Sequence, residues 1–500
     1  MKTRETTDLG KIMCPRIHVP ILGKQPLILQ FCAEYIFFAY LSLLILFLTQ
    51  ELALSQHQSY EIMAFFLGSN YILHCITASL INKWITYSLA IFQGLILNFI
   101  GITFLLFATG KSLLWLYFSL SFIILSNSFL QLGILIFTSD LYKKNTRLYQ
   151  TTFTKNQVIM NIGSIFGPMA SGVLCYLFNV RIAIFSMQVF VFLTMVIFCL
   201  SFPKIHNTST SRKNQITKNI SFILILAVVL CLGLMFLKDI PFQLIGACHW
   251  IIISGIIFYL FKKRDCQNLN DRTPIFMFFV NIICILFFTI FNQINGPLIL
   301  FTQEYTAKTL YHFDIPVQWF LSLESIFVIL IAFFLKKFKT SYTFFEKLST
   351  AGKLSLSMLL ISLAFAMLTI VGFLDSSSKI HKINALWLLP FYLLISLSEL
   401  AFVPTVLSYL SKTISARPAL LSLGFGYFFV SKGSGAYLSM SVAKAILGTQ
   451  IHSDQQFHQY IFMFSALTIL ASIISIAIFL VGVINTNLRN FQNLLSSGSW

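Results

Sequence analysis

Residues 387–410 (WLLPFYLLISLSELAFVPTVLSYL) and 419–438 (ALLSLGFGYFFVSKGSGAYL) are two consecutive apolar runs, each long enough to cross a bilayer as a helix. The first run contains Glu399 and the second contains Lys432. Each residue lies roughly 18 Å from the start of its run at a rise of ~1.5 Å per residue, near the middle of a hydrocarbon core ~30 Å thick. Because an unpaired charge at that depth is costly, the two residues predict a functional site.

The composition of the whole chain places it in a membrane. Of 500 residues, 57% are hydrophobic and 10% are charged, whereas a soluble domain has about 25% charged residues. The net charge of +18 comes from basic residues that gather in alternate loops, as the positive-inside rule requires, and it indicates no nucleic-acid partner. We expect an inner-membrane protein with both termini cytoplasmic. Its expected partners are the lipid bilayer and a small-molecule or short-peptide substrate, and its oligomeric state is unknown.

About fourteen apolar runs meet the length of a membrane span. They do not alternate as barrel strands do, so we predict an all-α polytopic membrane protein. The longest polar break follows the sixth run, which suggests two six-helix bundles separated by an extra two-helix hairpin. The predicted segments are a cytoplasmic tail (1–25), a bundle (26–203), a linker (204–219), the hairpin (220–262), a second bundle (273–486) and a tail (487–500).

Two further carboxyl groups lie at membrane depth. Glu34 and Glu324 each lie about 12 Å into their runs. Glu34 is either a proton site or a carboxyl that neighbouring helices hold neutral or hydrogen-bonded. Together with Glu399, these residues are the predicted proton-coupling groups.

The pairing of Glu399 with Lys432 allows two interpretations. On adjacent antiparallel helices the two side chains can form a static ion pair, or a pair that a proton or a charged solute breaks. Residues 433–435, Gly-Ser-Gly, are expected to reduce the bulk around the ammonium.

Amide side chains mark two other helices. Asn292 and Gln293 precede Gly296 and Pro297, and a proline there frees the carbonyl of Gln293. This predicts a kink that either contacts a solute or is satisfied by neighbouring helices. Asn161 shares its helix with a face of small residues that allows close helix packing; these are Gly163, Gly167, Ala170, Ser171 and Gly172.

The motifs of enzymes and pumps are missing from the sequence. There is no Walker loop, HExxH or GxSxG sequence, so we expect neither an enzyme nor an ATP-driven pump. The nine cysteines form no CxxC pair, and no disulfide, catalytic or metal site is predicted. The expected chemistry needs no cofactor other than a proton gradient.

Several stretches resemble the proton-coupled oligopeptide transporter family, a branch of the major facilitator superfamily. LLISLSELAFVP is similar to a family signature whose glutamate falls on Glu399, and the run 140–168 is similar to a second signature, with Asn161 and Gly163 on its Asn and Gly. The run 33–55 resembles the first-helix region, with Glu34 on its second glutamate. Tyr71 matches a pocket tyrosine, GFGYFFVSKGSGAYL resembles the eleventh helix, and the extra hairpin is usual in bacterial members.

The departures from the family pattern concern charge. The family's first-helix Glu and Arg fall on Phe31 and Tyr35, its helix-four Lys on Gln131, its helix-five Tyr on Gln157, its helix-seven Glu on Asn292, and a helix-eight Asn on Glu324. Lys432 has no counterpart in the pattern. One hypothesis is that Lys432 replaces the helix-four lysine as the partner of Glu399. The other is that the carboxyl-binding end of the peptide site is lost.

The resemblance implies a fold of the major facilitator type and proton-coupled uptake of di- or tripeptides by alternating access. Glu399 would receive the amino group or a proton, Lys432 would act as counter-charge or carboxylate ligand, and Glu34 would be a second proton site. The predicted substrate-binding residues are Lys432, Glu399, Tyr71, Asn161, Gln293, Asn292, Trp319, Glu324, Tyr427 and Ser431. The alternatives are a transporter of a cationic solute such as an amino acid or amine, and a transport-inactive scaffold or receptor.

Overall fold

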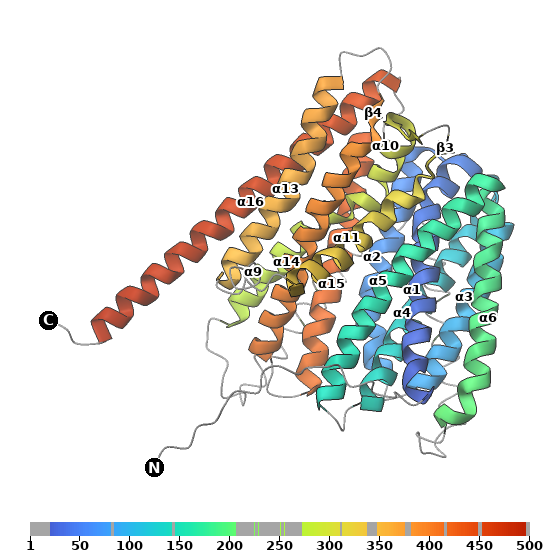
Figure 1. Cartoon of the computed structure of the whole chain (residues 1–500), viewed down its shortest axis with the longest axis horizontal. Helices are drawn as coiled ribbons and strands as arrows, with labels where there is room; N and C mark the ends of the chain where they lie inside the picture. Colours follow the sequence, from blue (N-terminus) through green and yellow to red (C-terminus); the bar gives the residue numbers. More distant parts are fainter. Residues whose placement is uncertain are drawn as a thin grey trace.

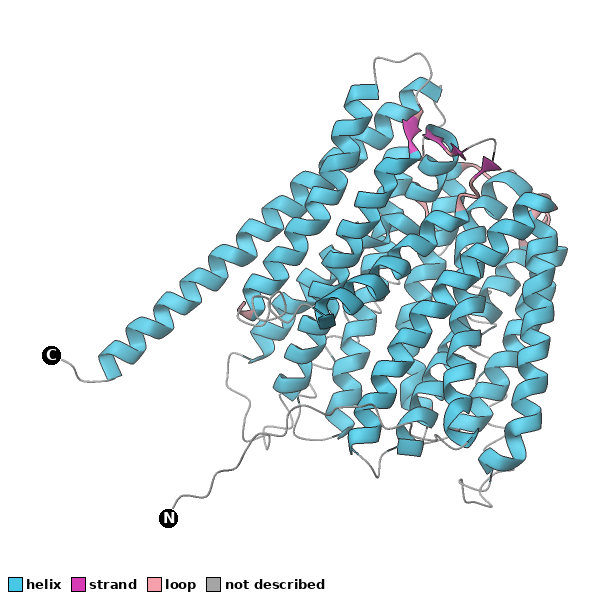
Figure 2. Cartoon of the chain, viewed as in Figure 1, coloured by secondary structure: helices cyan, strands magenta, loops and turns pink. Residues whose placement is uncertain are grey.

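The computed structural model describes residues 21–81, 85–142, 146–206, 273–310, 313–337, 348–375, 382–414, 418–448 and 453–496, with isolated positions 225, 229, 251 and 255. Nearly all of these residues are helical (Figure 2). The predicted hairpin 220–262 lies outside the described residues, apart from those isolated positions. The predicted domain boundaries, and the number of about fourteen helices, therefore stay predictions.

Among the described residues, the N-terminal bundle has six long helices (Figure 1). They are α1 (Ile21–Leu46), which continues as the π-helix η1 (Phe47–Glu51), α2 (Gln56–Leu80), α3 (Tyr87–Phe107), α4 (Leu114–Tyr142), α5 (Thr146–Leu177) and α6 (Val180–His206). Hydroxyl caps define two of the starts, since Ser55 accepts from the backbone N–H of Gln58 and Thr86 from that of Leu89.

The C-terminal bundle lies beside it, coloured yellow-green to red in Figure 1. Its helices are α9 (Thr273–Phe291), η2 (Asn292–Asn295), α10 (Pro297–Tyr305), α11 (Gln318–Lys337), α13 (Thr350–Asp375), η3 (Ala385–Trp387), α14 (Leu388–Ile414), α15 (Pro418–Leu447) and α16 (Ser453–Ser496). In the described part of the chain, four two-residue strands lie in the loops between helices: β1 (Thr306–Ala307) pairs in parallel with β4 (Ile383–Asn384), and β2 (Thr309–Leu310) pairs antiparallel with β3 (Phe313–Asp314).

The predicted kink near Pro297 is a full interruption of the helix. Residues Asn292–Asn295 form a 3₁₀ turn, Gly296 leaves the helical region, and Pro297 begins α10. A proline at the first helical position removes no helical hydrogen bond, which explains why the second half can restart there.

Ten of the described helices are long and apolar enough to span a membrane. Neither α2 nor α15 is among the ten, although they have 25 and 30 residues. These two helices pack against each other between the bundles. Their more polar composition fits that central position, because they face protein rather than lipid.

Glycines set how closely the helices approach at the centre. A Cβ on Gly163 of α5 would lie 2.8 Å from Cβ of Glu34 and from the carbonyl oxygen of Phe31, both on α1. A Cβ on Gly433 of α15 would lie 2.8 Å from the carbonyl oxygen of Gly68 on α2. The predicted small-residue face of α5 is therefore confirmed at Gly163.

Candidate substrate and proton site

Glu324 and Glu399 face each other across α11 and α14. The two helices pack together, and Ser396, on the turn before Glu399, donates a hydrogen bond of 2.8 Å to the carbonyl oxygen of Glu324. The carboxyl of Glu399 lies within hydrogen-bonding reach of the carboxyl of Glu324. Glu324 is buried, and Ser325 donates to its Oε2 at 3.0 Å. The structure thus brings two of the three predicted proton-coupling residues into one pair.

Lys432 lies where α15 meets α2 and α9. Its Nζ is 4.6 Å from the centre of the Tyr71 ring and 5.3 Å from the centre of the Phe288 ring. Aromatic faces stabilise an ammonium by cation–π attraction, most strongly where water is excluded. The carboxyls of Glu399 and Glu34 act on this ammonium as well, so Lys432 is the cation between the two halves of the site.

The sequence suggested that the glycines beside Lys432 reduce the bulk around its ammonium. In the structure they do not leave empty space there. The position of a Cβ on Gly435 is 2.6 Å from Cβ of Phe288, and that of a Cβ on Gly433 is 3.1 Å from Cβ of Tyr71. Both glycines instead let α15 pack closely on α9 and α2. This packing brings the two aromatic rings to the ammonium.

A direct ion pair between Lys432 and Glu399 is not formed. The ion pairs within 4.0 Å between side chains of the described residues are Arg181–Glu51 and Lys444–Glu61. Lys432 and Glu399 therefore interact through space rather than in contact. This geometry contradicts a static ion pair and leaves the ammonium free to take another anionic partner.

Glu34 has amide partners in place of a cation. Its Oε1 accepts hydrogen bonds from Gln30 Nε2 at 3.0 Å and from Gln131 Nε2 at 2.9 Å. Gln30 also donates to Gln131 Oε1 at 2.9 Å, which closes a three-membered network. Glu34 is 4% exposed. Gln131 stands where the resemblance places a lysine, so a neutral amide rather than a cation donates to the carboxyl at this position.

A chain of hydroxyl groups connects the two bundles. Ser164 of α5 donates to Ser325 of α11 at 2.7 Å, and Ser325 donates to Glu324. Ser164 also lies 2.9 Å from the carbonyl oxygen of Asn161. The side chain of Asn161 donates to the carbonyl of Gln157 on its own helix and is half-buried. The hydroxyl chain therefore reaches the Glu324–Glu399 pair from the opposite bundle.

Asn292 and Gln293 lie at the interruption between α9 and α10. Gln293 Nε2 donates to the carbonyl oxygen of Ser439 on α15 at 3.0 Å, while its Oε1 is buried without a hydrogen-bond partner among the described residues. Asn292 Oδ1 accepts from Asn295 at 3.0 Å, and its Nδ2 donates to the carbonyl of Phe288. Most of these amide groups are satisfied by protein, which favours a structural role for them.

Three other predicted residues have protein partners. Trp319 donates its indole N–H to the carbonyl of Met169 on α5 at 3.1 Å and so joins the bundles. Ser431 donates to the carbonyl of Tyr427 at 2.8 Å and contacts Asn281. Tyr427 is fully buried. Whether any of these residues also meets a substrate stays a prediction.

Sequence reasoning missed the hydrogen-bonding partners of the carboxyls. Gln30 precedes Glu34 by four residues, a spacing that puts both on one helix face, and this signal was available. Ser396 and Ser325 carried no such signal, because serine is common in membrane helices. Only the packing of α11 on α14 identifies them.

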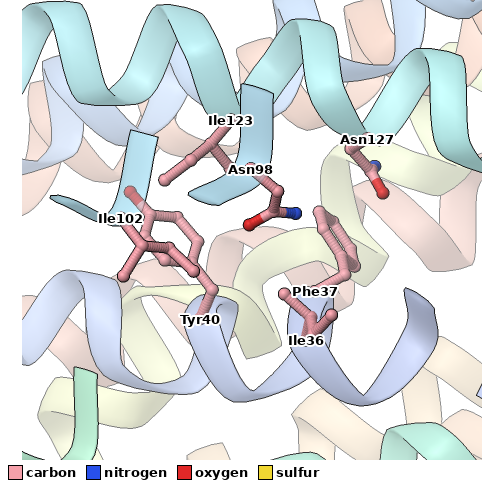
Figure 3. A pocket seen from close by; sticks show the side chains of 7 residues that line it. All are labelled: Ile36, Phe37, Tyr40, Asn98, Ile102, Ile123 and Asn127. Atoms are coloured by element: carbon pink, nitrogen blue, oxygen red, sulfur yellow. The ribbon is translucent and has the colours of Figure 1, made fainter. Parts of the chain in front are cut away.

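A small cavity within the N-terminal bundle lies apart from these groups (Figure 3). It has room for about one water molecule. Its lining residues are Ile36, Phe37, Tyr40, Asn98, Ile102, Ile123 and Asn127. None of the predicted site residues lines it, so this cavity is not the candidate site.

A protein-family model matches three quarters of the chain. The model is PTR2, described as the POT family, and it covers residues 88–462. The chain belongs to the POT family. The chain is thus an integral membrane protein of a transporter family, and the predicted family resemblance is confirmed.

Individual relatives are distant but extend over most of the chain. Peptide transporter YePEPT of Yersinia enterocolitica is 22% identical over 460 residues, covering 87% of this chain and 85% of the relative. Dipeptide and tripeptide permease A of Pectobacterium carotovorum is 23% identical over 406 residues, covering 79% of this chain and 78% of the relative.

Solved structures of POT transporters share the fold. The structure of the peptide transporter POT in complex with sulfate superposes with a TM-score of 0.76 at 18% identity, covering 93% of this chain and 94% of that structure. A bacterial homologue of the human drug peptide transporters PepT1 and PepT2 gives a TM-score of 0.77 at 15% identity, with 93% and 99% coverage. The predicted all-α fold of the major facilitator type is confirmed.

Proposed function

We propose that this chain takes up di- or tripeptides with protons by alternating access between its two bundles. Membership of the POT family supports transport, and the names of the relatives support peptides as the substrate class. The observation that carries the proposal is the cluster of Glu34, Glu324 and Glu399 around Lys432, between the bundles at membrane depth. No cofactor other than the proton gradient takes part.

The two poles of a peptide fit the two signs of charge in this cluster. The ammonium of the peptide binds Glu399 and Glu324, because two carboxyls together attract a cation strongly. The carboxylate of the peptide binds Lys432, whose ammonium has aromatic rings but no carboxylate in direct contact. Glu34 is the second proton site, held between Gln30 and Gln131.

Alternating access requires contacts between the bundles that can exchange. The hydroxyl chain from Ser164 to Glu324 is such a contact, since it links one bundle to a carboxyl of the other. Protonation or substrate binding at Glu324 changes the hydrogen-bond acceptor of the Ser325 hydroxyl. A change in the site therefore reaches the interface directly. We place the protein in the inner membrane with both termini cytoplasmic.

The test is uptake of a radiolabelled dipeptide into proteoliposomes under an imposed inward proton gradient. Uptake that exceeds equilibration and disappears when a protonophore is added supports the proposal. Uptake that ignores the gradient contradicts proton coupling. Protein that binds a partner but moves no solute at any pH supports the scaffold alternative instead.

A cationic solute is the second candidate, and the charge count favours it. Three carboxyls surround one lysine, and two positions where the family resemblance places cations hold Tyr35 and Gln131. Competition separates the candidates: excess amines and basic amino acids inhibit the uptake of a cationic transporter, whereas neutral dipeptides inhibit that of a peptide transporter.

A further inference from the structure

The contact between Glu324 and Glu399 is fixed by the backbone as well as by the side chains. The hydroxyl oxygen of Ser396 lies 2.8 Å from the carbonyl oxygens of both Glu324 and Tyr392, so its one proton is shared between them. This bridge sets α14 against α11 at the level of Glu324. Since Glu399 follows Ser396 by three residues, it lies on the same face of α14. The approach of the two carboxyls is thus built into the helix pair.

Few charged groups surround this pair. Lys432 of α15 acts on both carboxyls but lies beyond 4.0 Å from them, and the charge of Glu324 also acts on Tyr392 of α14. Glu34 of α1 reaches Lys432 from the other bundle. From α5 and α13 the hydroxyls of Ser164 and Ser357 face α11 and α14. Among the described residues, no cation is in contact with the pair.

Two carboxylates that face each other without a cation in contact repel each other, so they do not both ionise readily. One proton between them removes the repulsion and forms a hydrogen bond to a charged acceptor, which is stronger than a neutral one. The pair then behaves in titration as a unit rather than as two separate residues.

We propose that Glu324 and Glu399 form a carboxyl dyad that holds one shared proton, and that this dyad is the coupling site of the C-terminal bundle. The proton enters from water onto a carboxylate oxygen and leaves to water; only the O–H bond forms and breaks. Release follows when the ammonium of Lys432 or of the substrate approaches the pair. The role of the dyad in transport rests on the proposed function.

The test counts protons taken up by the purified full-length protein in detergent when the pH falls from alkaline to mildly acidic, using an indicator dye. The variants are Glu324→Gln, Glu399→Gln, the double variant and Glu34→Gln. We expect Glu324→Gln to take up one proton fewer than the wild type, and the double variant to lose no more than that. Glu34→Gln removes only the proton of Glu34 itself, so in that background Glu324→Gln is still expected to lower the count by one, because Glu34 lies on α1 among its own partners.

Two results overturn the dyad. If the double variant loses two protons where Glu324→Gln loses one, the carboxyls titrate independently. If Glu324→Gln loses none, Glu324 holds no proton in this range. Glu324→Asn provides a second neutral variant if the first does not fold, and Ser357→Ala is the control for a neighbouring change that leaves both carboxyls in place.

Dipeptide uptake measured on the same preparations separates this inference from the proposed function. Wild-type protein that moves no peptide but shows the shared proton overturns peptide transport and supports the dyad. Wild-type protein that moves peptides while its carboxyls titrate independently overturns the dyad and supports peptide transport.

Discussion

The two halves of the candidate site stabilise carboxyl groups within the helix bundles in different ways. In the N-terminal bundle, Glu34 is surrounded by the amides of Gln30 and Gln131. In the C-terminal bundle, Glu324 and Glu399 lie against each other with Lys432 nearby. One half supports a buried carboxyl with neutral hydrogen-bond donors, and the other gathers opposite charges.

This difference indicates which half of the site responds to a change of charge. Amide donors satisfy a carboxyl whether or not a cation is present, so Glu34 can change protonation without breaking an ion pair. In the C-terminal half, the ammonium of Lys432 has no fixed carboxylate partner, because it contacts aromatic rings rather than a carboxylate. Substrate charge is therefore expected to matter most in the C-terminal bundle.

The largest expected effect comes from Glu399→Gln, which removes one carboxylate from the charged half. Truncating one partner of a buried charge network costs several kcal/mol, so we expect gradient-driven dipeptide uptake to fall by about 100-fold. Peptide exchange without a gradient is expected to fall less, since binding does not need the proton. The measurement is uptake and counterflow in the same proteoliposomes. Equal losses in both assays would assign Glu399 to binding alone.

The next effect comes from Lys432→Ala. Loss of a charged partner for the substrate carboxylate is expected to weaken binding of ordinary dipeptides by about 10-fold, and binding of C-terminally amidated peptides far less. Lys444→Ala is the matched control on the same helix, where the lysine pairs with the exposed Glu61. Thermal-shift titration measures both affinities. If Lys432→Ala leaves uptake and affinity intact, Lys432 does not replace the missing lysine.

A reciprocal change moves the cation from one half to the other. Gln131→Lys puts an ammonium at the position where the family resemblance places a lysine, next to Glu34 in this structure. Combined with Lys432→Ala, it is expected to recover about fivefold of the lost dipeptide affinity, if a cation on either side can hold the substrate carboxylate. Gln131→Asn is the control that changes length without charge. Recovery by both variants alike would exclude charge as the cause.

The smallest effect comes from Gln30→Ala in the amide-supported half. Glu34 then keeps only Gln131, and losing one hydrogen bond to a charged acceptor is expected to cost about 2 kcal/mol of stability. The melting temperature in detergent measures this change. In the background of Glu34→Gln the same substitution is expected to cost less, because the acceptor is neutral. An equal cost in both backgrounds would mean that Gln30 acts by packing alone.

Much of the fold was predictable because membranes constrain it strongly. Apolar runs of sufficient length that do not alternate predict helices, since the backbone in lipid satisfies its hydrogen bonds only in helices or in closed barrels of alternating strands. The interruption at Gly296 and Pro297 was predicted as a kink because a proline there frees the carbonyl of Gln293. Its exact form was not, because a freed carbonyl can be satisfied by a bend or by a new helix start.

The sequence by itself determined which carboxyls and which ammonium lie at membrane depth, because depth depends only on position within an apolar run. Tertiary structure alone decided their partners. Glu399 was expected to pair with Lys432 and instead lies against Glu324, while Glu34 lies against Gln131, 97 positions away. The rotation and crossing of the helices decide which side chains meet. Rotation and crossing depend on glycine contacts and serine hydrogen bonds between helices, which no single run of sequence contains.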